Sequence, residues 1–337
     1  MYVEDLDLGA VRAFAAVAEH GQFTLAAAEL GISQQAVSKR IARLENQLGV
    51  ALFERVRSGA DPTPAGRRLL SHARDLLVRA DEAVAAVRDD PGPLRVAVLG
   101  ERQAAMRAMR FFLEQQPDCD AEIVLSHTEI MRSGGAVTSR DALLAGRVHA
   151  VFARAGGGPR PLPARVAAAP AYLEPLHLLV GKDHPLAGRA AIALSELRGT
   201  VIWVPGVRFP SEWADYYREL AEFAGFTIDS RRRPEPDRLA SANTSTNIEL
   251  IVSRVAASAT LMTFSGEGFE TPWHPNIRRV PVVDPVPAYP HALLWDATDT
   301  HPGLPDLIAH VRANYNAEIA TGCWAPPADR ALFGVRD

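Results

Sequence analysis

The chain has few cysteines, few aromatic side chains and no long apolar run. Two of its 337 residues are cysteines and 7% are aromatic. Cys119 and Cys323 stand far apart and match no metal-ligand spacing, so we expect ordinary free thiols rather than a disulfide or a redox switch. Glu4, Asp5 and Asp7 replace the basic start of a signal peptide, and no apolar stretch is long enough to span a bilayer. We therefore expect a soluble, cytoplasmic protein with no membrane partner.

Motifs of common catalytic sites are also lacking. The sequence has no phosphate-binding loop, no Gly-x-Ser-x-Gly elbow, no His-Glu-x-x-His and no acidic metal cluster. Its ten histidines are scattered, and His127, His149 and His177 are more typical of structural histidines than of catalytic bases. The better interpretation is a protein that is not an enzyme and carries no cofactor or metal.

Length and charge point to several units with one basic segment. A chain of 337 residues is too long for one typical domain and suggests two or three. The net charge of −4 gives no sign of nucleic-acid binding. Between Ser33 and Arg68, however, seven Lys or Arg stand against three Asp or Glu, a local charge of +4. Such a basic segment is typical of a surface that faces nucleic acid.

Residues 23–48 predict a helix-turn-helix. Thr24 is a suitable N-cap for a short Ala-rich helix, Gly31 suits the position just past its end, and Ser33 can cap a second helix. Two helices joined by so short a turn form the helix-turn-helix motif.

The second of these helices is amphipathic. Its apolar side consists of Val37, Ile41, Leu44 and Leu48. Its polar side carries amides, a hydroxyl and cations that suit base edges and phosphates in a DNA major groove, namely Gln34, Gln35, Ser38, Lys39 and Arg43. A merely solvated face is the alternative. The tight turn, the short first helix and the Gln-rich start favour DNA recognition.

Residues 50–63 predict a small wing. Leu52 and Phe53 begin an apolar strand, and the turn-forming residues 58–62 are expected to lead back from it. Arg55 and Arg57 at the base of such a hairpin can reach phosphates, although a solvated turn is the alternative.

A long helix should follow, with Thr63 as its N-cap and Pro64 as its first residue. Apolar residues then recur at alternating spacings of three and four, as in a coiled coil: Leu70, Ala73, Leu77, Ala80, Val84 and Val87. An amphipathic helix within one chain would show much the same stripe. Because the helix stands between domains, where no large core is available to cover it, we favour pairing with a second copy.

The rest of the chain alternates predicted strands and helices. Residues 89–93 resemble a hinge, and strands are expected at 94–99, 123–125 and 148–153, with helices between them, which indicates a parallel sheet. A second α/β lobe should follow, with residues 277–283 and 291–295 returning to the first lobe. Residues 302–316 predict a closing helix. The tail beyond them has no clear pattern, and we expect it to be disordered or to pack on a neighbouring copy.

The first seventy residues resemble the DNA-binding domain of LysR-type transcriptional regulators. The resemblance rests on residues 22–24, 27–30, 32–41, 44–45, 48–55 and 63–66; it is specific from Leu8 to Arg88 and looser to Tyr315. It implies a winged helix-turn-helix at 1–63, a dimerising linker helix at 64–90, and an effector-binding domain at 91–315. That domain has two α/β lobes, similar to periplasmic binding proteins, and a tail occupies 316–337.

The resemblance also implies partners and contact residues. The partners are a double-stranded DNA operator, a small-molecule effector, a second copy in a dimer that commonly becomes a tetramer, and RNA polymerase. The implied DNA contacts are Thr24, Ser33, Gln34, Gln35, Ser38, Lys39, Arg43, Arg55 and Thr63. The implied effector contacts are Glu101, Arg102, Ser126, Thr128, Pro205, Thr244 and Ser245.

The effector site departs from the usual pattern. Where the family often has a small hydroxyl residue after the first strand, this chain has Gly100, Glu101 and Arg102. Arg102 can pair with an acidic effector or stand in solvent, so the effector itself does not transfer from relatives. Two other interpretations stay open: a DNA-binding protein without an effector, and a small-molecule binding protein that does not use DNA.

Overall fold

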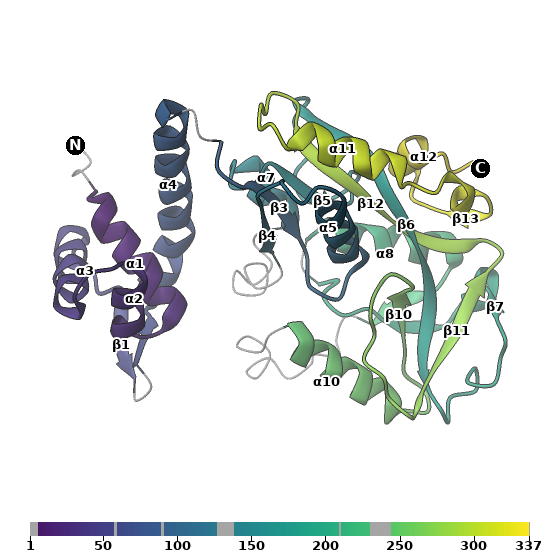
Figure 1. Ribbon diagram of the computed structural model, residues 1–337. Coiled ribbons are helices and arrows are strands. Elements are labelled where there is room, and N and C mark those ends of the chain that lie inside the picture. Colours follow the sequence, from purple (N-terminus) through teal and green to yellow (C-terminus); the bar gives the residue numbers. More distant parts are fainter. Residues whose placement is uncertain are drawn as a thin grey trace. The chain divides into compact units, whose positions relative to one another are not determined.

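The computed structural model describes residues 6–56, 59–88, 91–126, 138–208, 210–229 and 244–336. The chain divides into two compact units, residues 1–91 and residues 92–337, which are described separately below (Figure 1).

The first unit is a helical cluster with a two-stranded hairpin and a long final helix. Its elements are α1 (Leu8–His20), α2 (Phe23–Glu29), α3 (Gln34–Leu48), β1 (Phe53–Val56), β2 (Gly59–Pro62) and α4 (Pro64–Arg88). Asp7 begins α1 by accepting a hydrogen bond from the Gly9 amide at 2.8 Å. Phe14, fully buried on α1, lies at the centre of the core that the other helices share.

The turn between α2 and α3 forms as its residues predict. Gly31 has a left-handed backbone with φ of +63°, and the Ile32 amide donates to the Ala27 carbonyl at 3.1 Å, which closes α2. Ser33 then caps α3 by accepting from the Ala36 amide at 3.2 Å. The prediction that Thr24 caps α2 is wrong: the helix begins at Phe23, and Gln22 occupies the N-cap position without a side-chain bond. Packing of Phe23 on Phe53, with ring centroids 6.0 Å apart, fixes this earlier start.

Helix α4 has the predicted length, but its apolar stripe is divided. Leu70, Ala73 and Leu77 are buried against α1, so this part of the predicted seam is covered within its own unit. Helix α1 supplies an apolar surface for these residues, which their spacing in the sequence does not reveal. Further along, Val84 is 48% exposed and Val87 is 88% exposed. The C-terminal half of α4 therefore presents apolar side chains that its own unit does not cover.

The second unit consists of two α/β lobes joined by two crossing strands. Lobe 1 contains β3 (Leu94–Val98), α5 (Ala104–Gln115), β4 (Ala121–Leu125), α7 (Ser139–Leu144), β5 (Ala150–Ala153) and α11 (Leu304–Ala313). Lobe 2 contains β7 (Ile192–Ala193), η1 (Leu194–Leu197), β8 (Val201–Trp203), α8 (Glu212–Ala224), β9 (Thr227–Asp229), α10 (Thr244–Ala256), β10 (Met262–Gly266) and β11 (Ile277–Val283). The crossing strands are β6 (Val166–Gly181) and β12 (Val286–Asp296).

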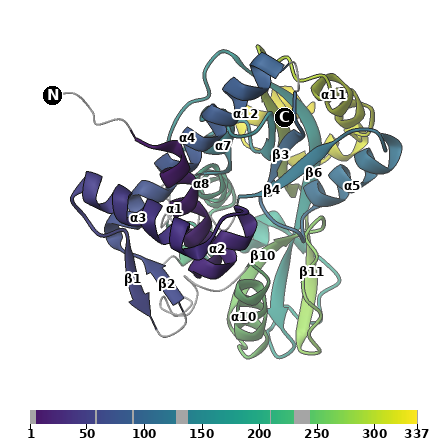
Figure 2. The same ribbon diagram turned by 60° about the vertical axis from the view of Figure 1, so that its left-hand side comes forward.

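The main sheet is mixed rather than wholly parallel. Strands β3, β4 and β5 are parallel, as predicted, but β12 runs antiparallel to both β5 and β6. Strand β11 does not return to lobe 1, as the sequence suggested. It pairs with the end of β6 and with β7, because its partners at residues 177–181 belong to lobe 2. Helices α5 and α11 cover one face of the lobe 1 sheet, and α7 lies on the other (Figure 2).

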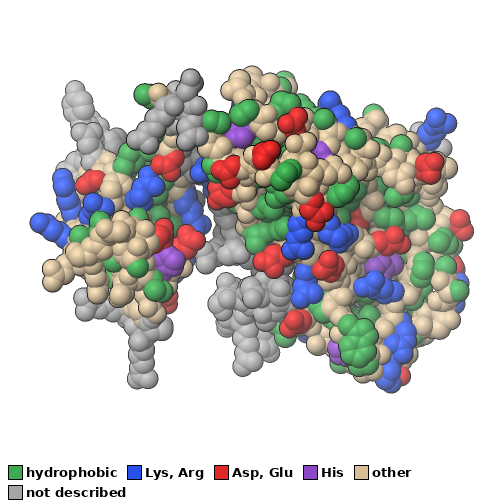
Figure 3. Space-filling model, viewed as in Figure 1, with side chains coloured by type: hydrophobic (Ala, Val, Ile, Leu, Met, Phe, Trp, Pro, Cys, Tyr) green, Lys and Arg blue, Asp and Glu red, His purple; other side chains and the backbone are tan. Residues whose placement is uncertain are grey.

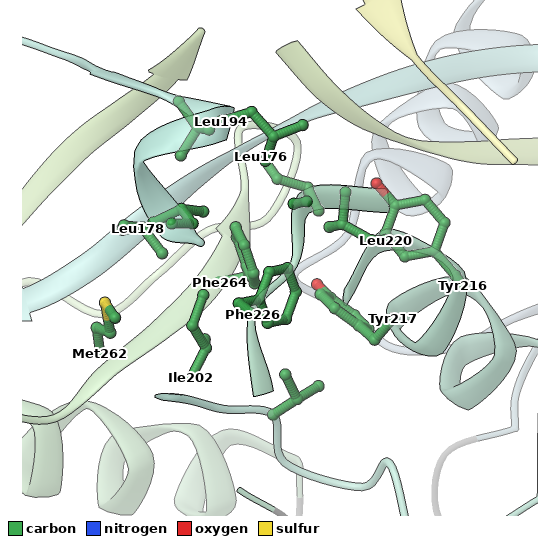
Figure 4. Packing of buried hydrophobic residues seen from close by; sticks show 14 of the residues in the cluster. Leu176, Leu178, Leu194, Ile202, Tyr216, Tyr217, Leu220, Phe226, Met262 and Phe264 are labelled. Carbon is green, nitrogen blue, oxygen red and sulfur yellow. The ribbon is translucent and has the colours of Figure 1, made fainter. Parts of the chain in front are cut away.

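Each lobe has its own core. In lobe 2, Tyr216 and Tyr217 of α8 pack with Leu176 and Leu178 of β6 and with Phe264 of β10 (Figure 4). In lobe 1, the two faces of the sheet form separate clusters, one of them under α5 and α11. The two lobes therefore have separate cores and share the pair of crossing strands.

The C-terminal tail is ordered, which corrects the expectation of disorder or packing on a neighbour. It forms η2 (Ala317–Ala320), β13 (Cys323–Trp324) and α12 (Pro327–Phe333). Strand β13 pairs with β12, and Phe333 is 1% exposed. The sequence concealed this because the helix has only seven residues and the strand only two.

Candidate nucleic-acid interface

Helix α3 is anchored by one side and open on the other. Val37, Ile41 and Leu44 are at most 3% exposed and pack into the cores beside α1. Leu48 was predicted to continue this stripe, but it is 38% exposed, because the helix outlasts the core that covers it. The buried side thus holds the first three turns of α3 firmly and fixes which side chains face outward.

The outward face of α3 is polar and unoccupied. Gln34, Gln35, Ser38 and Lys39 are all exposed, and none of them makes a hydrogen bond or ion pair with another residue that the structure describes. Arg43 is exposed too, with a loose ion pair to Asp7 at 3.7 Å. These side chains are therefore available to bases and phosphates without breaking internal bonds.

The hairpin that follows α3 is held in place by a residue that the sequence analysis overlooked. The Glu45 carboxylate accepts from the backbone amides of Leu52 and Phe53 at 2.7 and 3.2 Å. At the other strand, the Ala60 amide donates to the Gly21 carbonyl at 2.8 Å, and a Cβ at Gly59 would approach that oxygen to 2.1 Å. A glutamate on a helix gives no sequence signal of such a role. The wing is thereby tied to both α3 and the end of α1.

The remaining predicted DNA contacts occupy different positions. Thr24 is exposed within α2, and Arg55 lies in β1 opposite Ala60. Strand β2 begins at Gly59, so most of the predicted turn is strand. Thr63 caps α4 by accepting from Gly66 at 3.0 Å, and its hydroxyl donates to the Ala51 carbonyl at 2.7 Å. Thr63 therefore has a structural role whether or not it also touches DNA.

Charge is concentrated on the same side of the first unit. Lys and Arg side chains gather over α3 in Figure 3, on the edge of the first unit where the open polar face lies. The Arg67 guanidinium also covers the wing by donating to the Pro62 carbonyl at 2.5 Å. The exposed cations Lys39 and Arg43 thus lie on the same helix as the free amides and hydroxyl, as contact with a phosphate-lined groove requires.

The predicted effector residues are only partly brought together. Ser126 is buried, and its hydroxyl already has two hydrogen-bond partners, the Val98 carbonyl and the Ser139 hydroxyl, both at 3.2 Å. Pro205 accepts the Trp213 indole N–H at 3.2 Å. Thr128 lies outside the described residues, as do the side chains of Thr244 and Ser245 at the start of α10.

Glu101 and Arg102 lie where the two lobes meet. Glu101 is exposed, and Arg102 is half-buried with its carbonyl accepting from the Glu270 amide of lobe 2 at 2.8 Å. Nearby, Arg107 of α5 donates to the Gly268 carbonyl at 2.9 Å and lies 3.7 Å from the Glu270 carboxylate. The loop after β3 is therefore part of an interlobe contact, as an effector site between the lobes requires.

The crossing strands carry a buried polar pair that the sequence analysis missed. His291 of β12 lies 3.0 Å from the Glu174 carboxylate of β6, and both side chains are 11% exposed. Tyr172 stacks on His291 with ring centroids 4.3 Å apart. Burial beside Glu174 raises the pKa of Tyr172 well above its usual value, so its hydroxyl is protonated. The junction between the lobes is thus polar inside.

A fully buried ionic contact also escaped the sequence analysis. Arg154, at the end of β5, is 0% exposed and binds Asp329 of α12 at 2.7 Å and Glu219 of α8 at 2.8 Å. Glu219 stands 65 positions from Arg154 in the chain and Asp329 stands 175, so no sequence spacing could have paired them.

Metal sites, reactive thiols and membrane spans each have requirements with which the described residues can be compared. Nowhere in the described ranges do three or more His, Cys, Asp or Glu side chains gather so as to hold a metal ion. Cys119 and Cys323 are free, and burial raises the pKa of both thiols. In the part of the chain that the structure describes, no helix is long and apolar enough to cross a membrane.

Comparisons with known proteins agree with the geometry of the first unit. The family profile described as bacterial regulatory helix-turn-helix protein, lysR family, matches residues 8–67. The small neutral protease regulatory protein of Streptomyces coelicolor is 33% identical over 221 residues, which is 63% of this chain and 67% of that protein. A probable hydrogen peroxide-inducible genes activator of Mycobacterium xenopi is 33% identical over 191 residues, covering 55% of this chain and 95% of the relative.

Solved structures share the fold over nearly the whole chain. The crystal structure of CbnR, a LysR family transcriptional regulator, aligns with a TM-score of 0.57 at 23% identity, covering 91% of this chain and 98% of CbnR. Full-length CbnR in complex with its target DNA aligns with a TM-score of 0.55 at 21% identity, covering 91% and 99%. Taken with the open polar face of α3, these findings show that the chain belongs to the LysR family of bacterial helix-turn-helix proteins and is a DNA-binding transcriptional regulator with a two-lobed effector-binding domain.

Proposed function

We propose that α3 enters the major groove of an operator and reads it with Gln34, Gln35 and Ser38, while Lys39 and Arg43 bind phosphate or guanine. The observation that carries this proposal is the free, exposed state of the first four side chains on a helix anchored from behind. Glutamine can bond bidentately to an adenine edge, and cations neutralise phosphates. The wing is tied to α3 through Glu45 and includes Arg55, to which we assign a contact with the adjacent backbone or minor groove; Thr24, Ser33 and Thr63 are assigned to the edge of the same interface.

Two copies of the chain are needed for a bipartite operator. The exposed apolar residues on the later turns of α4 support pairing through that half of the helix: Leu76, Ala83, Val84 and Val87, with half-buried Ala80 beside them. Leu70, Ala73 and Leu77 stay in the core of their own unit. A dimer supplies two α3 helices at a fixed spacing, and assembly to a tetramer would join two such pairs.

The second unit senses a small organic effector between its lobes. The support is the interlobe contact at Arg102 and the polar pair formed by Glu174 and His291. One relative is named as a probable activator of hydrogen peroxide-inducible genes. Peroxide reacts with thiolates, and the raised pKa of Cys119 and Cys323 keeps both thiols protonated, which argues against peroxide sensing by either one. Effector binding would change the arrangement of the dimers on DNA and so their contact with RNA polymerase.

We further infer that the protein acts in the cytoplasm, as a non-catalytic switch. The support is that its relatives are named as regulators and that Glu174 and His291, buried between the lobes, pair with each other. Effector-independent DNA binding is the competing function. It would be favoured if operator binding did not respond to any metabolite.

The test is selection of genomic DNA fragments by the purified protein and by the double variant Gln34→Ala, Lys39→Ala. The matched control is Asn46→Ala, Lys182→Ala, which removes one amide and one lysine at exposed positions away from the start of α3. We expect the wild type and the control to enrich the same bipartite site and the double variant to lose it. Equal enrichment by all three proteins would remove α3 from the interface.

A further inference from the structure

The C-terminal tail inserts one aromatic side chain into each lobe. Trp324 of β13 is 5% exposed and belongs to the lobe 2 core, with its ring centroid 5.7 Å from that of Tyr216 and 5.3 Å from that of Phe223. Phe333 of α12 is 1% exposed and belongs to the lobe 1 core, where it packs on Tyr315. The segment 317–336 therefore spans the junction between the lobes instead of belonging to one of them.

An ionic network lies between these two anchors. Asp329, which is 0% exposed, accepts from the Arg154 guanidinium at 2.7 Å and from the Gly156 amide at 2.9 Å. Arg154 of lobe 1 also donates to Glu219 at 2.8 Å and to the Glu212 carbonyl at 3.2 Å, both on α8 of lobe 2. One fully buried guanidinium thus holds lobe 1, lobe 2 and the tail together.

Residues 155–158, which follow β5 and are called the strap below, strengthen the same junction. The Gly158 amide donates to the Asp215 carboxylate of α8 at 2.7 Å, and Arg140 of α7 donates to the Ala155 carbonyl at 3.1 Å. The backbone of the strap therefore donates to carboxylates of α8 and α12 and accepts from a guanidinium of lobe 1. The pair of Arg154 and Asp329 is fully buried, and an ionic contact from which water is excluded is the costliest to break.

Among the described residues, a second contact between the lobes is more exposed: it consists of bonds to the Arg102 and Gly268 carbonyls at 2.8 and 2.9 Å and one loose ion pair. Arg107 and Glu270, which face each other across the lobes at 3.7 Å, have side chains that are 47% and 60% exposed. Water and salt screen such a pair, and it contributes little. The two contacts therefore differ in strength. If the lobes separate, the exposed contact of α5 with the loop after β10 yields first.

We propose that residues 317–336 form an interlobe staple, a fixed hinge element about which the lobes open on the side of Arg107 and Glu270. The staple limits how far the lobes can move and returns them to one closed arrangement. Opening at Arg107 exposes the junction where Glu174 and His291 lie, so the staple gates access to that junction. The proposal concerns the second unit alone and does not depend on DNA binding.

The test measures the distance between the lobes in the full-length protein. Spin labels are placed on Arg110→Cys of α5 and Ser253→Cys of α10, two exposed positions, in a Cys119→Ser background; Cys323 is buried and remains unlabelled. Pulsed electron resonance then compares the wild type with Asp329→Asn, Trp324→Ala and Arg107→Ala. Asp306→Asn, an exposed aspartate on α11, is the matched control.

We expect a narrow distribution for the wild type and the control, and a shift to longer distances of unchanged width for Arg107→Ala. Asp329→Asn and Trp324→Ala should broaden the distribution at least twofold. If either variant folds poorly, Glu219→Gln weakens the same network at lower cost to folding, because the Glu219 side chain is 34% exposed. This variant should also broaden the distribution. Wild-type distributions in all staple variants that fold would overturn the proposal. Loss of DNA selection by the α3 variants, measured separately, would leave this outcome untouched.

Discussion

Two polar regions of the chain differ in the exposure of their side chains and in the partners that those side chains have. On α3, Gln34, Gln35, Ser38 and Lys39 are exposed and have no partner in the described part of the chain. Around Arg154, the guanidinium and the Asp329 carboxylate are fully buried and pair at 2.7 Å, and Glu219, whose side chain is 34% exposed, adds a second bond at 2.8 Å. The first arrangement leaves bonding capacity for another molecule, and the second uses that capacity to fix the fold. Polar side chains on one chain can thus be assigned to recognition or to architecture by their partners and burial.

The largest effect is expected at Arg154. Replacing Arg154 with Ala leaves Asp329 buried without a cation, and breaking a buried ion pair in this way costs about 3–5 kcal/mol. Calorimetry should show the second unit unfolding at lower temperature while the first unit keeps its transition. A stability equal to that of the wild type would mean that the junction is not the architectural element described above. Lys182→Ala, at an exposed lysine, serves as the control.

A buried polar group without a partner sharpens the comparison. His177 is 5% exposed, its Nε2 has no hydrogen bond within the described ranges, and burial beside Arg279 lowers its pKa to about 4. Below pH 6.5 the folded state then binds fewer protons than the unfolded state. The free energy of unfolding is therefore highest above pH 6.5 and falls as the pH drops towards 4. Between pH 7 and pH 5 the free energy of unfolding should fall by about 2 kcal/mol.

Denaturant titrations at the two pH values check this loss. His177→Gln should remove most of it, because the side chain then no longer titrates. If the variant shows the same decline as the wild type, another group is responsible for the pH dependence.

A smaller effect is expected from the cation on α3. If Lys39 binds a phosphate, Lys39→Ala should weaken operator binding and flatten the slope of log K against log salt by about 0.9. The folded stability should change by less than about 0.5 kcal/mol, because the side chain is exposed and unpaired. Fluorescence anisotropy at several salt concentrations measures the slope. Lys182→Ala should leave it unchanged, and an unaltered slope in the Lys39 variant would exclude that contact.

The smallest effect on stability is expected at Arg107. Its exposed bonds to Gly268 and Glu270 should contribute less than about 1 kcal/mol, so Arg107→Ala should unfold within a degree or two of the wild type. Thermal melts measure this. A loss comparable with that of the Arg154 variant would show that exposure does not separate the two interlobe contacts.

Local rules predicted the first unit well because its structure depends on near neighbours. Gly31 and Ser33 set the turn, and the spacing of Val37, Ile41 and Leu44 sets the buried side of α3. The error at Thr24 arose because ring packing on Phe53, thirty residues away, selected another start. The open face of α3 could be predicted because it needs no distant partner.

Long-range contacts were beyond the reach of the sequence. Leu70 and Leu77 have the spacing of a coiled coil, yet α1 covers them, and periodicity does not say which surface a stripe meets. Arg154 and Asp329 meet only because β13 pairs with β12 and brings the tail back across both lobes. The candidate effector residues followed from family order alone, and of these only the loop at Arg102 is seen at the contact between the lobes.

The most direct test of the account is selection of a randomised DNA library by the wild type and by Gln34→Ala. The account predicts that both proteins enrich a bipartite motif with the same half-site spacing. The variant should lose the preference for one base, most simply an adenine, at one position in each half, with a cost of about 1–3 kcal/mol at that position. Identical motifs from the two proteins would contradict the claim that the free face of α3 reads the operator.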